Sequence, residues 1–140
     1  PRRGGARSPE TIVSLSITTT LNYAASLVTL ERFEEAMSLL RKTVPVVRRV
    51  LGESHILTLK MRGVYAETLH RNCATLEDQR EAVATLEDTV RAIRRVLGGA
   101  HPFTPIIERH LRNARAALRA RETPPTDARQ DRDLDEVENA

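Results

Sequence analysis

The 140-residue chain is poor in aromatic residues, cysteine, glycine and proline. It has two tyrosines, two phenylalanines and no tryptophan, so its core has to be built from aliphatic side chains. With 6 glycines and 7 prolines, it has too few turn residues for a fold of many short strands. The single cysteine, Cys73, excludes an internal disulfide and any metal site made of several cysteines. An all-α fold is therefore expected.

The charge is uneven along the chain, although the net value is only +3. Residues 1–10 carry +2, residues 11–121 carry +6 and residues 122–140 carry −5. We therefore separate a basic N-terminal stub, 1–9, from an acidic tail, 122–140. The tail is predicted to be disordered, because its few scattered apolar residues cannot offset the entropy cost of ordering.

No segment approaches the roughly 20 apolar residues that a membrane-spanning helix needs, and no signal-peptide core follows the first residues. These features predict a cytoplasmic or otherwise intracellular protein without membrane insertion. The chain starts with Pro1 in place of Met, which fits a processed protein or a fragment of a longer array.

A repeated pattern organises the sequence. The segment 46–55 (VVRRVLGESH) recurs as 92–101 (AIRRVLGGAH), 46 residues further on. Upstream, 23–27 (YAASL) recurs as 65–69 (YAETL), 42 residues further on. The difference of four residues indicates an insertion around residues 72–78, in a loop, where repeat arrays tolerate insertions.

Apolar residues at helical spacing predict five helices, which form two hairpins and one further helix. The expected ranges are 10–30, 33–51, 56–71, 79–97 and 103–121. Gly52 and Gly98 are expected to end their helices in the left-handed conformation, Pro45 to kink the second helix, and Pro102 to start the fifth.

These helices define an array over residues 10–121. Its parts are a first unit 10–52, a second unit 53–98 and a capping helix 102–121. A hairpin cannot bury its apolar face alone, so neighbouring hairpins are expected to stack into a right-handed superhelix. The first helix of each pair would then line the concave side.

Several short motifs of the repeat point to a family: LNYA at 21–24, RFEEA at 32–36, LGESH at 51–55 and LGGAHPFT at 97–104. Over about residues 18–111 the chain resembles the tetratricopeptide repeat of the kinesin light chain type. The resemblance implies a solenoid of about two and a half repeats that binds extended peptides or partner helices in its concave groove.

Two departures from the family pattern lead to structural expectations. Glu31 stands where the family usually has glycine between the two helices, so this turn is expected to be made differently. Arg112 occupies the position of the small residues Ala24 and Ala66, where a large charged side chain would block a following helix. We therefore expect the fifth helix to be a terminal cap with a polar outer face.

The register of the resemblance also selects the residues that would face the groove. They are Asn22, Lys60, Glu67, His70, Arg71, Arg109, His110 and Asn113. A net positive groove would suit a peptide that carries carboxylates, because Arg and Lys form charge-assisted hydrogen bonds with them. The alternative is that these are ordinary solvent-facing polar residues.

The remaining reactive residues do not form a catalytic pattern. His55 and His101 recur at helix starts, which favours capping or packing over metal binding. His70 and Cys73 lie three residues apart, but no acid or oxyanion donor accompanies them, so Cys73 is interpreted as an exposed, oxidisable thiol in the inserted loop. No motif for a cofactor is present.

We therefore expect a protein- or peptide-binding scaffold or adaptor that is not an enzyme and has no cofactor. The alternative is a structural subunit packed permanently in a larger assembly. The stripe Arg109, Arg112, Arg115 and Arg119 is typical of a solvated helix face. Nucleic acid is a poor candidate partner, because the chain has hardly any aromatic side chains to stack on bases.

Overall fold

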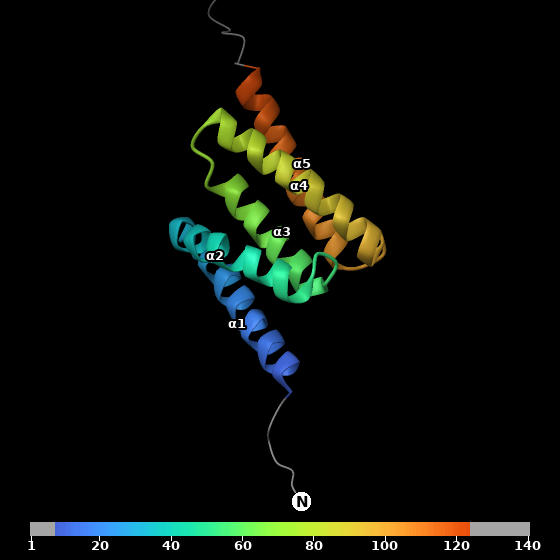
Figure 1. Ribbon diagram of the computed structural model, residues 1–140. Coiled ribbons are helices and arrows are strands. Elements are labelled where there is room, and N and C mark those ends of the chain that lie inside the picture. Colours follow the sequence, from blue (N-terminus) through green and yellow to red (C-terminus); the bar gives the residue numbers. More distant parts are fainter. Residues whose placement is uncertain (1–7, 124–140) are drawn as a thin grey trace, which may run out of the picture.

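The computed structural model describes residues 8–123, which form an all-α helix-hairpin repeat without strands (Figure 1). The start of α1 and the end of α5 lie at opposite ends of the molecule (Figure 1). The predicted tail and stub lie outside the described residues, except for Ser8, Pro9, Glu122 and Thr123. The helices are α1 Pro9–Thr29, α2 Phe33–Leu51, α3 Ile56–Arg71, α4 Leu76–Leu97 and α5 Phe103–Glu122.

Local capping explains why several helices begin where the sequence predicted. Ser8 Oγ accepts a hydrogen bond from the Thr11 backbone N–H at 3.2 Å, and Pro9 takes the first helical position. His55 Nδ1 accepts from Leu57 N–H, and His101 Nδ1 accepts from Phe103 N–H, each at 3.1 Å. The predicted capping role of the two recurring histidines is thus confirmed.

The start of α4 differs from the prediction, because the helix begins at Leu76 and not at residue 79. Thr75 and Asp78 form a capping box, in which each side chain accepts a hydrogen bond from the other residue's backbone N–H. Most of the insertion is therefore an added helical turn: α4 has 22 residues, whereas α2 has 19. Of the predicted insertion region 72–78, only residues 72–75 remain outside the helices.

Gly52 and Gly98 end α2 and α4 with positive φ values of 89° and 79°. The predicted left-handed stops are thus present at both glycines, although their ψ values of 164° and 165° are extended and differ from those of a left-handed helix. This combination of angles is accessible almost only to glycine. Pro45 lies inside α2, which continues on both sides of it, and the kink stays a prediction.

Two aliphatic cores meet on α3. Met61 packs with the first core, which contains Ile17, Leu21 and Ala24 of α1 and Leu40, Val44 and Val47 of α2. Leu59 and Ala66 pack with the second core, formed with α4 and α5. Burial of each large aliphatic side chain contributes about 1.5–3 kcal/mol.

The helices alternate between an inner and an outer row. The backbones of the first helices approach one another in succession, α1 with α3 and α3 with α5. Within the described residues, the backbones of α2 and α4 do not approach closely, although Met37 and Ala82 belong to one core cluster with Leu69. The array therefore curves toward the side of α1, α3 and α5. The right-handed sense of the superhelix stays a prediction.

The turn between α1 and α2 corrects the expectation about Glu31. Its φ is +59°, the only positive value of a non-glycine residue in the described chain. Arg32 N–H donates to Leu27 O at 2.8 Å and Glu31 N–H donates to Val28 O at 3.0 Å, the hydrogen-bond pattern of a Schellman motif. The turn therefore has the same conformation as one with glycine at this position, and the expectation that it is made differently is wrong. Glu31 is strained there, because a residue with a side chain disfavours positive φ.

We predict that Glu31→Gly raises the free energy of unfolding by about 0.5–1 kcal/mol. A left-handed residue with a side chain costs about 1–2 kcal/mol, and the entropy of glycine in the unfolded chain offsets part of the gain. Urea unfolding measures the change. Glu31→Gln is the control, because it removes the charge and keeps the strain; an equal gain in both variants would contradict the backbone explanation.

Candidate functional site

A polar hollow of about 260 Å³ opens between α3 and α5, on the inner side of the array. Its lining consists of six residues that the sequence selected: Glu67, His70, Arg71, Arg109, His110 and Asn113. Lys60 lies on α3 two helical turns before Glu67, and is half-buried. Asn22 is not part of this group, since it lines a separate hollow on α1 with Ala25, Ser26, Thr29 and Leu30.

Close packing of α3 against α5 positions the hollow. At Gly63 an added Cβ would lie only 3.0 Å from Phe103 Cζ and 3.2 Å from Ile107 Cδ1. The missing side chain therefore lets the start of α5 approach α3 closely. Further along the two helices, larger polar residues line the hollow.

Arg71 is held by three groups. Its guanidinium lies 3.6 Å from the Glu67 carboxylate and 4.0 Å from that of Glu31. It also lies over the Phe33 ring, 5.1 Å from the centroid, in a cation–π contact. These contacts fix the Arg71 side chain at the rim of the hollow and connect it to the α1–α2 hairpin.

His70 is fixed by a buried glutamine that the sequence reasoning missed. Gln79 is 1% exposed, and its Nε2 lies 3.1 Å from His70 Nδ1 and donates to Ala114 O at 2.9 Å. Burial lowers the pKa of His70 most strongly, while the hydrogen bond with Gln79 and the charge of Glu67 raise it. His70 is therefore held neutral near pH 7.

His110 faces Glu67 across the hollow, with 3.7 Å between Nδ1 and the carboxylate. Its Nδ1 is buried and has no hydrogen-bond partner in the described chain. Burial is the main cause that lowers the pKa of His110; Glu67 raises it, and the charges of Arg109 and Arg71 lower it further. Two neutral imidazoles and three charged side chains thus give the hollow a small positive charge.

The loop thiol differs from the sequence interpretation, because Cys73 is half-buried and not exposed. Its Sγ–H donates to the Gln79 side-chain oxygen or to the His70 backbone carbonyl. No contact between the thiol and the His70 ring is present among the described residues. The arrangement thus gives no support to a cysteine–histidine catalytic pair.

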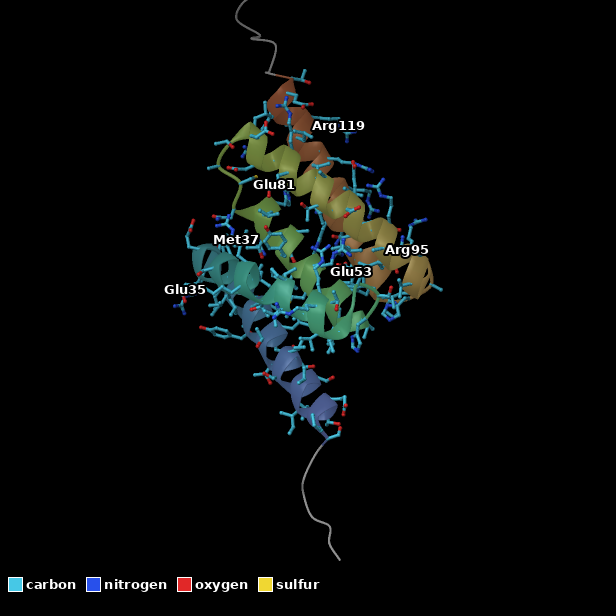
Figure 2. The ribbon with its side chains drawn as sticks, viewed as in Figure 1. Glu35, Met37, Glu53, Glu81, Arg95 and Arg119 are labelled. Atoms are coloured by element: carbon cyan, nitrogen blue, oxygen red, sulfur yellow. The ribbon has the colours of Figure 1, made fainter. Side chains whose placement is uncertain are left out.

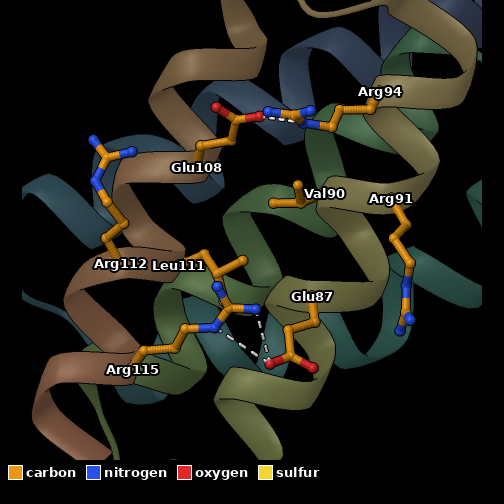
Figure 3. Close-up of a pocket in the computed structure, with 8 residues that line it drawn as sticks. All are labelled: Glu87, Val90, Arg91, Arg94, Glu108, Leu111, Arg112 and Arg115. Atoms are coloured by element: carbon orange, nitrogen blue, oxygen red, sulfur yellow. Dashed lines mark hydrogen bonds and ion pairs between the residues drawn. The ribbon is translucent and has the colours of Figure 1, made fainter.

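A second hollow, of about 360 Å³, lies between α4 and α5 and contains much of the arginine stripe (Figure 3). Arg115 pairs with Glu87 at 3.1 Å, and Arg94 pairs with Glu108 (Figure 3). Arg112 extends away from these pairs. Other charged side chains project outward along the same helices, from Arg95 on α4 to Arg119 on α5 (Figure 2). The stripe is therefore an exposed face on which Arg115 is already paired.

Residues 17–57 match the family model described as tetratricopeptide repeat. This segment is similar to a tetratricopeptide repeat. The matched segment covers most of α1, all of α2 and the start of α3. Neither the curated proteins nor the solved structures contain a match to this chain. Tetratricopeptide repeats generally mediate protein–protein interaction.

The second hairpin departs from the matched tetratricopeptide repeat in two ways. It carries the four-residue insertion, most of which forms the first turn of α4, and the buried Gln79 occupies the position equivalent to Phe33. The polar side chain allows this hairpin to make hydrogen bonds with α3 and α5 where the first hairpin has an aromatic contact. The hollow is therefore built on the part of the repeat that differs most.

Sequence reasoning also missed an ion-pair group outside the hollow. Arg62 is 9% exposed and lies 3.6 Å from Glu53 and 3.4 Å from Asp88. Burial lowers the pKa of Arg62, while Glu53 and Asp88 raise it. The group connects the loop after α2 with α4. The two acids offset the charge of the buried guanidinium, and each also pairs with an exposed arginine, Glu53 with Arg48 and Asp88 with Arg91.

The described residues contain no group of three or more His, Cys, Asp or Glu that could hold a metal ion. By length and composition, α1 could cross a membrane: an 18-residue window has a mean hydropathy of 1.2. The expectation that no segment approaches this limit is therefore wrong, because residues 11–30 contain no charge. The exclusion of membrane insertion stays a prediction.

We predict that the stability of the chain falls as the pH decreases below about 6.5. Both histidines have lowered pKa values when folded, so below the ordinary pKa the unfolded chain binds more protons than the folded chain. Stability from these groups is complete above about pH 6.5 and is lost as the pH falls toward the folded pKa values. Urea midpoints at about pH 7.5 and about pH 5.5 measure the loss, above the range where carboxylates titrate.

The double variant His70→Gln with His110→Gln is the comparison for this experiment. Its midpoint is expected to change less between the two pH values than that of the unaltered chain, because glutamine does not titrate. Equal changes in both chains would show that other groups are responsible.

Proposed function

We propose that the chain is a non-enzymatic protein-binding scaffold or adaptor, and that its partner lies along the α1, α3 and α5 side. The observation that carries the proposal is the gathering of six polar residues in one hollow between α3 and α5. At about 260 Å³, the hollow is smaller than the 300–1,000 Å³ typical of small-molecule sites, and fits one or two side chains of a peptide. The match of residues 17–57 to the tetratricopeptide repeat supports a protein as the partner.

The partner segment is proposed to be acidic. Lys60 and Arg109 make no ion pair with the described residues, so both cations are available to a carboxylate. Arg71, in contrast, is already paired with Glu67 and contributes by holding that carboxylate away from the ligand. The partner would then exchange hydration of Lys60 and Arg109 for charge-assisted hydrogen bonds.

Two finer assignments belong to the same proposal. We propose that the repeat is of the kinesin light chain type, because the motif Leu-Gly-x-x-His occurs at 51–55 and again at 97–101. We also propose an intracellular location, which agrees with a single, unpaired cysteine. A structural subunit of a larger assembly is the second candidate, favoured by the exposed apolar side chains Ile12 and Leu30 on α1 and its turn.

The binding proposal predicts that Lys60→Glu with Arg109→Glu weakens binding of acidic peptides at least about tenfold, the effect of losing one charge-assisted hydrogen bond. The probe is an array of peptides rich in Asp and Glu, compared with the same peptides carrying Asn and Gln. Fluorescence anisotropy measures Kd, and circular dichroism confirms that the variant remains helical.

The matched control is Lys42→Glu with Arg49→Glu, which makes the same change in net charge at exposed positions of α2. This variant is expected to bind as the unaltered chain does. Equal weakening in both variants would show that only the overall charge matters, and equal binding of the neutral peptides would overturn the acidic partner.

A further inference from the structure

One side of α1 is exposed along its whole length in the part of the chain that the structure describes, and we term it the α1 stripe. It consists of Ile12, Leu15, Ser16, Thr19, Tyr23 and Ser26, all of which are exposed. Ile12 and Tyr23 are 55% and 54% exposed, although both are large. The stripe lies opposite the side of α1 that is buried against α2 and α3, and the start of α1 extends beyond the other helices (Figure 1).

The internal repeat shows what covers such a surface in this molecule. α3 is equivalent to α1, 42 residues further along, so Ser16, Thr19 and Ser26 correspond to Thr58, Met61 and Thr68. These three α3 residues are 1%, 0% and 0% exposed. Met61 packs in one cluster with residues of α1 and α2. The hairpin that precedes α3 therefore buries the surface that is open on α1.

Two hydroxyls of the α1 stripe, those of Thr19 and Ser26, already donate hydrogen bonds within the helix. The hydroxyl of Thr58, the equivalent of Ser16, is buried without a hydrogen-bond partner among the described residues. Thr19 Oγ1 donates to Leu15 O at 2.9 Å, and Ser26 Oγ donates to Asn22 O at 2.8 Å. Thr68, the equivalent of Ser26, makes the same bond to Val64 O at 2.7 Å and is fully buried. Burial of the α1 stripe therefore leaves no unmade hydrogen bond from the hydroxyls of Thr19 and Ser26.

We propose that the α1 stripe docks a helix hairpin of a partner protein. The hairpin presents an aliphatic row to α1, as Leu40, Val44 and Val47 of α2 are presented to Met61 on α3. The small residues at the centre of the stripe let the backbones approach closely, and Ile12, Leu15 and Tyr23 supply the apolar contact. This docking site is separate from the proposed groove and independent of it.

A second copy of this chain does not supply such a hairpin. Both of its hairpins already use their aliphatic sides in the two cores. The exposed side of α5 is no substitute, because it carries Arg109, Arg112 and Arg119 and would place charges on an apolar stripe.

The test adds a second α1–α2 hairpin as the probe. Residues 9–55 are joined directly to residues 14–140. Ser14 is equivalent to Ile56, so the added hairpin is connected to α1 in the same way as the native α1–α2 hairpin is connected to α3. The extended chain is expected to unfold in one transition, with Tm at least about 5 °C above that of the unaltered chain. A second extended chain carries the α3–α4 hairpin, residues 56–101, in the same position and is expected to show the same gain.

The substitution Thr19→Glu distinguishes docking from a general effect of the added residues. In the unaltered chain, position 19 is exposed and the Tm is expected to stay within about 1 °C. In the extended chain, the substitution is made in the original α1 and not in the added copy. It places a charge at the position equivalent to Met61 of α3, under the added hairpin, and the gain in Tm is expected to be lost. Ala116→Glu, at an exposed position of α5, is the control and is expected to leave both chains unchanged.

Four results would overturn the proposal. The first is that neither extended chain has a higher Tm than the unaltered chain, including the case in which the extended chains do not fold. The second is that Thr19→Glu is harmless in the extended chain. The third is that the unaltered chain forms a dimer by light scattering that Thr19→Glu dissolves, which would assign the stripe to self-association. The fourth is that it binds phosphatidylcholine vesicles and Thr19→Glu abolishes the binding, which would assign the stripe to a lipid surface.

Discussion

Burial of α3 on both sides is the constraint on which the rest of the structure depends. Met61 belongs to the core of the first hairpin, whereas Leu59 and Ala66 belong to the core made with α4 and α5. A helix between two cores cannot have one apolar and one polar side, and α3 buries residues around most of its circumference. Because the first hairpin closes its core with Met61 of the second, we expect the two hairpins to unfold together.

The polar residues of α3 are consequences of the same position. Arg62 can be buried only because Glu53 and Asp88 approach it from the elements on either side. Gln79 and His70 satisfy each other where α4 and α5 meet the end of α3. The inner hollow lies between α3 and α5, beyond the close approach at Gly63. Scaffold and candidate binding site are therefore parts of one arrangement.

The functional residues that could be predicted were those on one helix face. Residues 67, 70 and 71 recur at helical spacing on α3, and 109, 110 and 113 do so on α5, so contact between the two helices brings them together. Asn22 occupies an equivalent position in the repeat, but α1 and α5 lie on opposite sides of α3, so Asn22 is not part of the hollow. The position within a repeat does not show which helices are neighbours. Gln79 could have been noticed from its alignment with Phe33, although no local rule indicates that the amide is buried.

The sequence by itself determined the five helices, their hairpin pairing and most of their ends, because helical periodicity and capping are local properties. The capping box of Thr75 and Asp78 was also a local signal, and the start of α4 was missed although the sequence contained it. Tertiary structure alone decided that Glu31 adopts a positive φ, that Arg62 is buried, and that Thr19 is open whereas its equivalent Met61 is covered. These features depend on which helices lie next to one another in space, and equivalent positions in a repeat differ only in their neighbours.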